Sequence, residues 1–406
     1  MTVSDIDPRL VQAEPGFSGA VKEFWRRLTQ GELGSLPVVL GLAAVWIYFQ
    51  SANSNFLSSG NLTNLMLQIA AVGTISVGVV MVLLLGEIDL SVGSVSGLAA
   101  ATMAVLNVKD GWSPVPAIGA GLLVGAGIGL VQGIWVTKLR VPSFVVTLAG
   151  LLAWQGALLH VLGSTGTVNL TDKTIVDLAG TFFSDAVGWA LAAVVVAVTV
   201  ATTVAHRVRS RAAGLTPRPL RADIVRLAVI AVGTTIAVAV FNDDRGVPLA
   251  VCIFIGFVVI FDILTRRTVF GRHVFAVGGN AEAARRAGIR VDRVRAVVFI
   301  LASTMAAAGG ILGASRLLAV NQSSGSGDVL LNSIAAAVIG GTSLFGGRGS
   351  AWSALLGALV IGSIANGMDL LGQESDVKFM VTGAVLLVAA TIDAVSRRGR
   401  QASGRA

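Results

Sequence analysis

"AIGAGLLVGAGIGLVQG", residues Ala117–Gly133, is the stretch that decides the fold. It contains no charged side chain, and with its apolar neighbours it extends from about residue 114 to 137. About 20 apolar residues are needed to cross a bilayer as a helix. Its glycines and alanines let helix backbones approach closely where lipid supplies no hydrophobic driving force for association. We therefore predict a membrane-spanning helix whose small residues, Gly125 and Gly129 among them, serve packing.

The rest of the chain repeats this pattern. Of its 406 residues, 54% are hydrophobic and 13% are charged, whereas globular chains carry about 25% charged residues. The charge is concentrated between apolar runs near 35–50, 65–85, 90–107, 114–137, 142–163, 186–205, 224–241, 248–264, 294–315, 329–345, 350–370 and 377–395. These runs predict an all-α, polytopic helical membrane protein with about twelve transmembrane helices.

The basic residues indicate how the chain is oriented, because cytoplasmic loops are enriched in Lys and Arg. If the N-terminus is cytoplasmic, the inner loops hold most of the basic residues, including eight arginines from Arg266 to Arg295. The outer loops are instead acidic, as at Asp243 and Asp244. We predict that both termini are cytoplasmic. The net charge of +8 is then a topology signal, and a nucleic-acid partner is unnecessary.

The chain divides into three segments. Residues 1–34 lack the apolar centre of a signal peptide, and they are predicted to form a cytoplasmic tail. Phe17, Val21, Phe24 and Leu28 lie there at helical spacing, which is typical of a short interfacial helix; a disordered tail is the alternative. Residues 35–395 form the transmembrane domain, and residues 396–406 a basic cytoplasmic tail.

Catalytic machinery is missing from the sequence. A phosphate-binding P-loop needs a lysine after glycine, and none of the five lysines follows one. The three histidines and Cys252 do not have the spacing of metal ligands. We predict that the chain is not an enzyme and carries no cofactor. Any ATP must be bound by a partner subunit.

Neutral polar side chains inside the apolar runs are candidates for a translocation path. Buried ionisable residues usually mark ion pathways, and here they are few and lie near the ends of the runs. The neutral groups suit a neutral polar solute such as a sugar, although each of them could equally serve packing. These candidates are Gln68, Gln132, Trp154, Gln155 and Asn366.

Two glycine-punctuated turns each precede a helix. "GEIDLSVGS", Gly86–Ser94, carries Glu87 and Asp89, and Asp89 or Ser91 is expected to cap the following helix; a proton site is the alternative. "GGTSLFGGRGS" begins with Gly340 and Gly341. Broken helices in corresponding halves are typical of transporters built from repeats, so a repeat is suggested.

A small helix is predicted within the basic loop at about 265–295. In "GGNAEAARRAGI", Gly278–Ile289, Asn280 is a good N-cap, Glu282 favours the positive end of a helix, and Gly288 can adopt the left-handed stop. A helix of about two turns is too short to be stable alone, so we expect it to dock on a partner. Its candidate residues are Gly279, Asn280, Ala281, Glu282, Ala283, Ala284, Arg285, Arg286 and Gly288.

This loop resembles the coupling loop of permease subunits from ATP-binding-cassette (ABC) sugar importers, in the branch for ribose, xylose and multiple monosaccharides. The similarity is carried by "GRHVFAVGGNAEAARRAGI" (271–289), "GEIDLSVGS", "VPSFVVTLAG" (141–150) and "IAAAVIGGTSLFGGRGS" (334–350), in the family's order. It extends from roughly Asn61 to Asp393.

The resemblance implies a function and partners. In the family, the short helix seats in a groove of the cytoplasmic ATPase and transmits its closure. The permease is a homodimer in the bacterial plasma (inner) membrane, surrounded by lipid, and receives sugar from an extracytoplasmic binding protein. The chain is then expected to be the permease subunit of an ATP-driven monosaccharide importer, and longer members of this kind favour xylose.

Two departures from the family and one rival interpretation remain. The family core has about ten spans, so the helix pair near 186–241 looks inserted. Asn332 and Ser333 stand where the family often has an acidic residue, which puts the sugar preference in doubt. The rival is a secondary transporter of a small polar solute, driven by an ion gradient. The twelve predicted spans fit a secondary transporter, but the scarcity of buried acidic residues and the presence of a docking helix do not.

Overall fold

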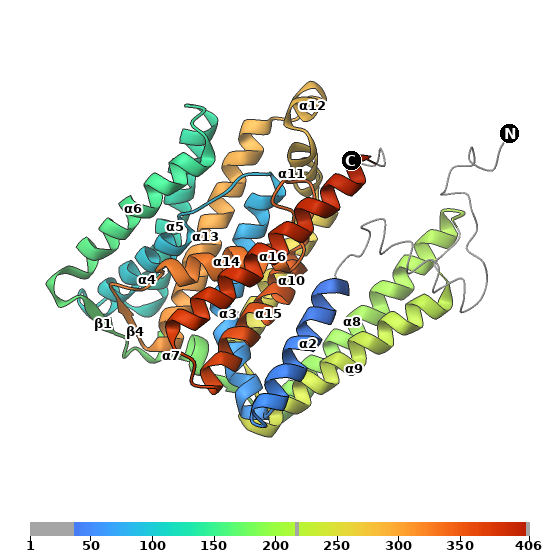
Figure 1. Ribbon diagram of the computed structural model, residues 1–406, viewed down its shortest axis with the longest axis horizontal. Helices are drawn as coiled ribbons and strands as arrows, with labels where there is room; N and C mark the ends of the chain where they lie inside the picture. Colours follow the sequence, from blue (N-terminus) through green and yellow to red (C-terminus); the bar gives the residue numbers. More distant parts are fainter. Residues whose placement is uncertain (1–35, 216–218, 403–406) are drawn as a thin grey trace.

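The computed structural model describes residues 36–215 and 219–402, so the interfacial helix predicted within residues 1–34 lies outside the described chain. The described residues form fifteen α-helices and two small two-stranded sheets (Figure 1). The helices are α2 (Leu36–Ala52), α3 (Ser59–Leu84), α4 (Val92–Val108), α5 (Pro114–Thr137), α6 (Ser143–Leu162), α7 (Lys173–Gly180), α8 (Asp185–Ala212), α9 (Leu220–Asp244), α10 (Leu249–Arg267), α11 (Val269–Gly279), α12 (Ala281–Arg286), α13 (Val291–Leu317), α14 (Gly327–Ile339), α15 (Ala351–Leu370) and α16 (Ser375–Ala402).

Each of the twelve predicted apolar runs lies mainly in one of these helices. Eight described helices, α3, α5, α6, α8, α9, α10, α13 and α15, are long and apolar enough to cross a membrane. Three more are apolar but shorter: α2 and α4 have 17 residues each and α14 has 13. The protein is therefore an all-helical polytopic membrane protein, and twelve crossings remain a prediction.

The core is organised around α3 and α13. Helix α13 packs against α3, α4 and α5, and small residues make the approach close. A Cβ atom added at Gly125 of α5 would lie 2.6 Å from the backbone oxygen of Ser303 and from Cβ of Ala307 on α13. The predicted packing role of this glycine is confirmed, because any side chain there would force the two helices apart.

Helices α8 and α9 form a hairpin that leans away from the bundle (Figure 1). They pack mainly against each other, with α9 also touching α3, and most of their side chains are exposed. An ion pair between Arg207 and Asp223 joins them near their loop. At their base, strand β2 (Phe182–Phe183) pairs with β3 (Val247–Pro248).

The second sheet joins loops that are distant in sequence. Strand β1 (Thr167–Asn169), after α6, pairs antiparallel with β4 (Ala319–Asn321), after α13, and Val168 lies opposite Val320. These short strands were not predicted, because a run of three residues carries no detectable alternation. They fix the loops at the end of the bundle opposite α12 (Figure 1).

The helices differ in extent from the predicted segments at three places. The segment 265–295 is mostly helical, since α10 continues to Arg267 and α11 follows after Thr268, whose hydroxyl accepts a bond from the Gly271 amide (3.1 Å). The apolar run 329–345 is helical only to Ile339, because Gly340 begins a turn in which Gly341 has φ +101°. Helix α16 continues to residue 402, into the predicted tail.

Candidate functional site

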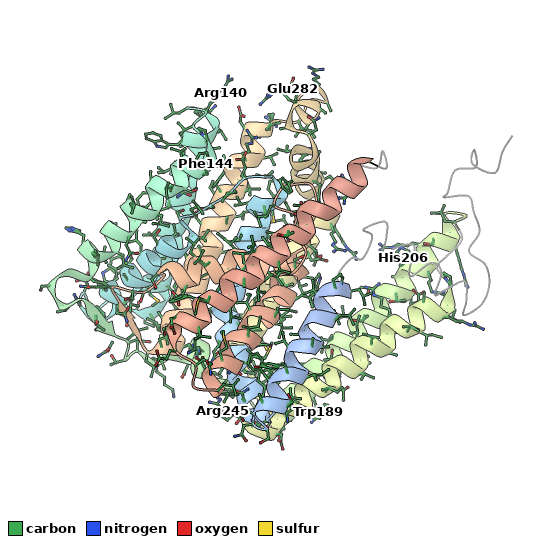
Figure 2. The ribbon with its side chains drawn as sticks, in the orientation of Figure 1. Arg140, Phe144, Trp189, His206, Arg245 and Glu282 are labelled. Atoms are coloured by element: carbon green, nitrogen blue, oxygen red, sulfur yellow. The ribbon has the colours of Figure 1, made fainter. Side chains whose placement is uncertain are left out.

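Helix α12 has the local structure that its sequence predicts. The Asn280 side chain accepts a hydrogen bond from the Ala283 amide (2.9 Å), and Gly288 has φ +84°. Glu282 forms exposed ion pairs with Arg285 and Arg286, both at 3.2 Å, which contribute little to stability. The helix has six residues, which is close to the two turns expected. Figure 2 shows Glu282 at the extreme end of the molecule.

The segment before α12 contacts both glycine-rich turns. The Gly347 amide donates to the carbonyl of Leu84 at the end of α3 (2.9 Å). A Cβ atom added at Gly278, at the end of α11, would lie 2.8 Å from that Gly347 nitrogen. One added at Gly86 would lie 3.3 Å from the Phe345 oxygen. Three motifs that are far apart in sequence therefore meet through backbone atoms: Gly278 contacts the end of α3 and the Gly340–Ser350 turn, and that turn contacts Gly86.

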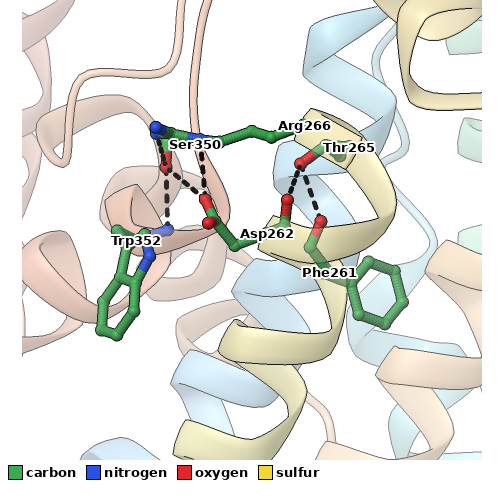
Figure 3. A network of polar contacts seen from close by, with 6 residues as sticks. All are labelled: Phe261, Asp262, Thr265, Arg266, Ser350 and Trp352. Carbon is green, nitrogen blue, oxygen red and sulfur yellow. Dashed lines mark hydrogen bonds and ion pairs between the residues drawn. The ribbon is translucent and has the colours of Figure 1, made fainter. Parts of the chain in front are cut away.

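A polar network fixes the turn before α15 to the end of α10 (Figure 3). Arg266 pairs with Asp262 on its own helix (2.8 Å) and donates to the Ser350 hydroxyl (2.8 Å). The Ser350 hydroxyl also accepts from the Trp352 amide (3.3 Å). The beginning of α15 is therefore coupled to the helix that leads into α11 and α12.

The same turn is held on its other side by α16. The Asp393 carboxylate accepts hydrogen bonds from the Ser343 hydroxyl and from the Leu344 amide, both at 3.2 Å. These contacts were not predicted, because nothing in the sequence links residue 393 to the turn. The turn is thus fixed between α10 and α16.

A basic pocket of about 310 Å³ opens beside α12. Within it, Arg295 pairs with Glu87 (3.0 Å), and the Ser143 hydroxyl donates to the same carboxylate (2.6 Å). Arg140 lies at the same end of the molecule as Glu282 (Figure 2). The pocket is lined by Glu87, Thr137, Arg140, Ser143, Arg285 and Arg295, among others. It joins the α3–α4 turn, the α5–α6 loop and the α12–α13 segment.

Asp89 and Ser91 do not cap α4 as expected. Asp89 Oδ1 accepts from the Ser91 amide (2.8 Å) and the Ser91 hydroxyl (2.6 Å). Ser91 is the N-cap residue of α4 but makes no side-chain cap bond. Its hydroxyl instead accepts from Gln132 Nε2 of α5 (2.7 Å). All three side chains are buried, so the structure brings three of the predicted residues into one polar cluster.

The other candidates lie around this cluster or elsewhere. Trp154 lies beside it on α6, and Gln155 donates to the carbonyl of Gln322 (3.0 Å). Gln68 is half-buried on α3, and Asn366 exchanges hydrogen bonds with Asn61 (2.8 and 3.0 Å). Gly340 packs tightly against the backbone of α15. The structure does not bring Gln68, Asn366, Gly340 or Gly341 into the cluster.

The apolar helices form a polytopic membrane protein, and its buried polar cluster and its small exposed helix at one end are features that a transport subunit can use. None of the five lysines in the sequence follows a glycine. The chain belongs to the family described as "Branched-chain amino acid transport system / permease component", whose model matches residues 61–390. It is a multi-pass permease component of an ABC transport system, and it is not an ATPase.

Curated relatives resemble the chain over most of its length. It is 36% identical to the xylose transport system permease protein of Escherichia coli (strain K12), covering 96% of both chains. It is 31% identical to the ribose import permease protein of Bacillus subtilis (strain 168), covering 89% of this chain and 94% of that one. It is 30% identical to the L-arabinose ABC transporter permease protein of Azospirillum brasilense, covering 86% and 84%. No solved structure matches the chain.

Proposed function

We propose that this chain is the membrane-spanning permease of an ATP-driven monosaccharide importer and that xylose is its sugar. The choice of sugar is supported by similarity to a xylose permease over 96% of both chains, including the α8–α9 region. The ribose and L-arabinose permeases are less similar, at 31% and 30% identity. The related pentoses are therefore the competing substrates.

Helix α12 is the proposed contact with the cytoplasmic ABC ATPase. The observation that carries this assignment is a capped, exposed six-residue helix at the basic end, preceded by Gly278, which contacts the end of α3 and the turn before α15. Closure of the ATPase pair would displace α12, and the contacts of Gly278 with the Leu84–Gly347 backbone pair would transmit the movement. The permease would then alternate between outward-open and inward-open states.

The complete importer, as we propose it, is a homodimer of this chain in the bacterial plasma membrane. It binds two ATPase domains inside and receives sugar from an extracytoplasmic binding protein. The ion-driven secondary transporter is the competing function. Uptake that survives collapse of the proton gradient and stops on depletion of ATP separates the importer from this rival.

The direct experiment is purification of the tagged permease from its own membranes in mild detergent. A P-loop ATPase should copurify with the wild type and be lost from the double variant Glu282→Arg, Gly288→Leu. Asp376→Arg is the matched control, because this residue lies exposed in the first turn of α16, at the opposite end of the bundle (Figure 1). If folded wild-type protein brings down no ATPase, the importer assignment is wrong.

A further inference from the structure

Three buried polar atoms around the start of α4 have no hydrogen-bond partner among the described residues. They are Asp89 Oδ2, Gln132 Oε1 and Trp154 Nε1. A buried polar atom left unsatisfied costs about 1–3 kcal/mol. Buried polar groups are ordinarily paired, so three such atoms on neighbouring side chains are candidates for contact with a bound ligand.

The three side chains come from three elements and are neighbours in the structure. Asp89 and Gln132 are joined through the Ser91 hydroxyl, at 2.6 and 2.7 Å. A Cβ atom added at Gly150 of α6 would lie 2.9 Å from both Gln132 Nε2 and Trp154 Nε1. The glycine at position 150 therefore lets both side chains approach the backbone of α6 closely, and a side chain there would collide with both.

The cluster lies behind the basic pocket. Two of the elements place one residue in the pocket and another in the cluster: Glu87 precedes Asp89 by two positions, and Thr137 follows Gln132 by five. On α6, the pocket residue Ser143 precedes by two turns Gly150, which lies against Gln132 and Trp154. Two hydrogen bonds lie between pocket and cluster. The Ser143 hydroxyl donates to Glu87 (2.6 Å), and the Thr147 hydroxyl donates to the Ile88 carbonyl (3.3 Å).

On the other side, the loop between β4 and α14 covers the start of α4. A Cβ atom added at Gly93 would lie 2.6 Å from the Gly325 oxygen, and one added at Gly325 would lie 2.7 Å from the Gly97 nitrogen. Gln155, next to Trp154, holds the same loop by donating to the Gln322 carbonyl (3.0 Å). The cluster is thus closed at both ends.

The chemistry of the unpartnered atoms indicates the class of ligand. A carboxylate oxygen and an amide oxygen accept hydrogen bonds, while an indole N–H donates one. A metal cation could use the two oxygens but not the N–H. Each hydroxyl of a sugar both donates and accepts, so a polyhydroxylated ligand satisfies all three. The Trp154 ring adds an apolar surface for the carbon skeleton.

We propose that Asp89, Gln132 and Trp154 form the site that binds the hydroxyl groups of the monosaccharide in transit, closed here between the Ser143–Glu87 contact and the loop at Gly325. This inference rests on the proposed importer function and names the residues that recognise its substrate. The site opens on the outer side when the loop leaves Gly93 and Gly97, and toward the basic pocket when Ser143 leaves Glu87.

The experiment uses the importer reconstituted in liposomes with its ATPase and its binding protein. ATP-driven uptake of radiolabelled xylose, ribose and L-arabinose is measured together with ATP hydrolysis. The variants are Trp154→Phe and Gln132→Met, which remove one hydrogen-bonding group each and retain similar volume. The matched controls are Trp189→Phe on the exposed face of α8 and Gln373→Met in the exposed α15–α16 loop.

We expect the two site variants to retain ATPase stimulation by the loaded binding protein, while sugar delivered per ATP falls about threefold to tenfold, as for one lost hydrogen bond. Competition with singly deoxygenated analogues of the sugar gives a second measurement. Each variant should lose the wild type's discrimination against one particular analogue, the one lacking the hydroxyl that the mutated side chain bound. A purely structural role would not change this selectivity.

The possible failures have different meanings. Absence of ATP-driven uptake of any of the three sugars by the wild type would show that the proposed function itself is wrong. An active wild type with unchanged uptake per ATP and unchanged selectivity in both variants would overturn the site alone. Parallel loss of uptake, ATPase stimulation and thermal stability would also overturn it, because the residues would then serve only packing.

Discussion

Gly125 and Gly127 lie two positions apart on α5, on opposite sides of the helix, and have opposite surroundings. A Cβ atom at Gly125 would lie 2.6 Å from atoms of Ser303 and Ala307, whereas one at Gly127 meets no atom within 4 Å. Overpacking a close contact costs about 1–3 kcal/mol or more. Gly125→Leu is therefore expected to lower the melting temperature of the purified protein and to abolish uptake, because α5 must move away from α13.

Gly127→Leu is the control for this prediction. Both substitutions raise helix propensity by the same amount and add the same apolar side chain, so only the contact with α13 differs. The Gly127 variant should keep wild-type uptake. Wild-type stability and uptake in the Gly125 variant would show that close packing of α5 on α13 is not required.

The Glu87–Arg295 pair is partly buried, with the side chains 15% and 26% exposed. Removing one partner leaves the other charge partly desolvated and without its ion pair, which costs about 1–3 kcal/mol. Both Glu87→Gln and Arg295→Gln should lower the melting temperature, and the double variant should be less affected than the sum of the two. Strictly additive effects in this double-mutant cycle would mean that the two side chains are not coupled.

At the scale of elements, α12 depends on its cap. Asn280→Ala removes the bond from the Ala283 amide (2.9 Å), and loss of a cap costs about 1 kcal/mol. A six-residue helix has few other bonds to compensate, so affinity for the ATPase should fall about fivefold. Asn280→Ser, which can still cap, should bind nearly as well as wild type in a titration of the detergent-solubilised complex. If Asn280→Ala binds the ATPase with wild-type affinity, the N-cap of α12 is not required for docking.

The prediction of elements succeeded where the signal was local. The cap at Asn280, the left-handed turn at Gly288 and the helices under the apolar runs all depend on neighbouring residues, and the structure contains them. The Asp89–Ser91–Gln132 cluster could be suspected from its residue types only. Its members are far apart in the chain, and only the packing of α5 against the start of α4 brings them together. For the same reason, the hydrogen bond between Ser343 and Asp393, which are distant in the chain, was not predicted.

The α8–α9 hairpin is an element that should be dispensable for folding. Phe183 and Val247 are paired across β2 and β3, so the chain ends left by removing residues 185–244 lie side by side and a short glycine linker can join them. An even number of crossings is removed, so the later helices should keep their orientation. The variant should insert and bind the ATPase, with modestly lowered stability because Val251 loses its contacts with Val238 and Phe241. Failure to insert would show that the hairpin belongs to the core.

At the scale of the whole molecule, an arrangement of twelve crossings with both termini inside predicts which loops are accessible from outside the cell, and cysteine labelling tests this prediction. Cys252 is the only cysteine, so Cys252→Ser provides a background for single cysteines. The five exposed positions chosen are Asp110, Arg140, Leu215, Glu282 and Glu374. A membrane-impermeant maleimide added to intact spheroplasts should label Asp110→Cys and Glu374→Cys. The others should react only after permeabilisation.

Leu215 decides between twelve crossings and ten. It follows Arg207, Arg209 and Arg211 near the end of α8, and basic residues of this kind are retained on the cytoplasmic side. If α8 and α9 both cross the bilayer, Leu215→Cys must be protected from outside, while Asp185→Cys at the other end of α8 reacts. If Leu215→Cys and Asp185→Cys are both labelled in intact spheroplasts, the hairpin does not cross and the twelve-span arrangement is wrong. The number of crossings would still be even, because α10 enters the membrane from the same side in either arrangement. Glu282 would therefore remain on the side where a cytoplasmic ATPase can reach it.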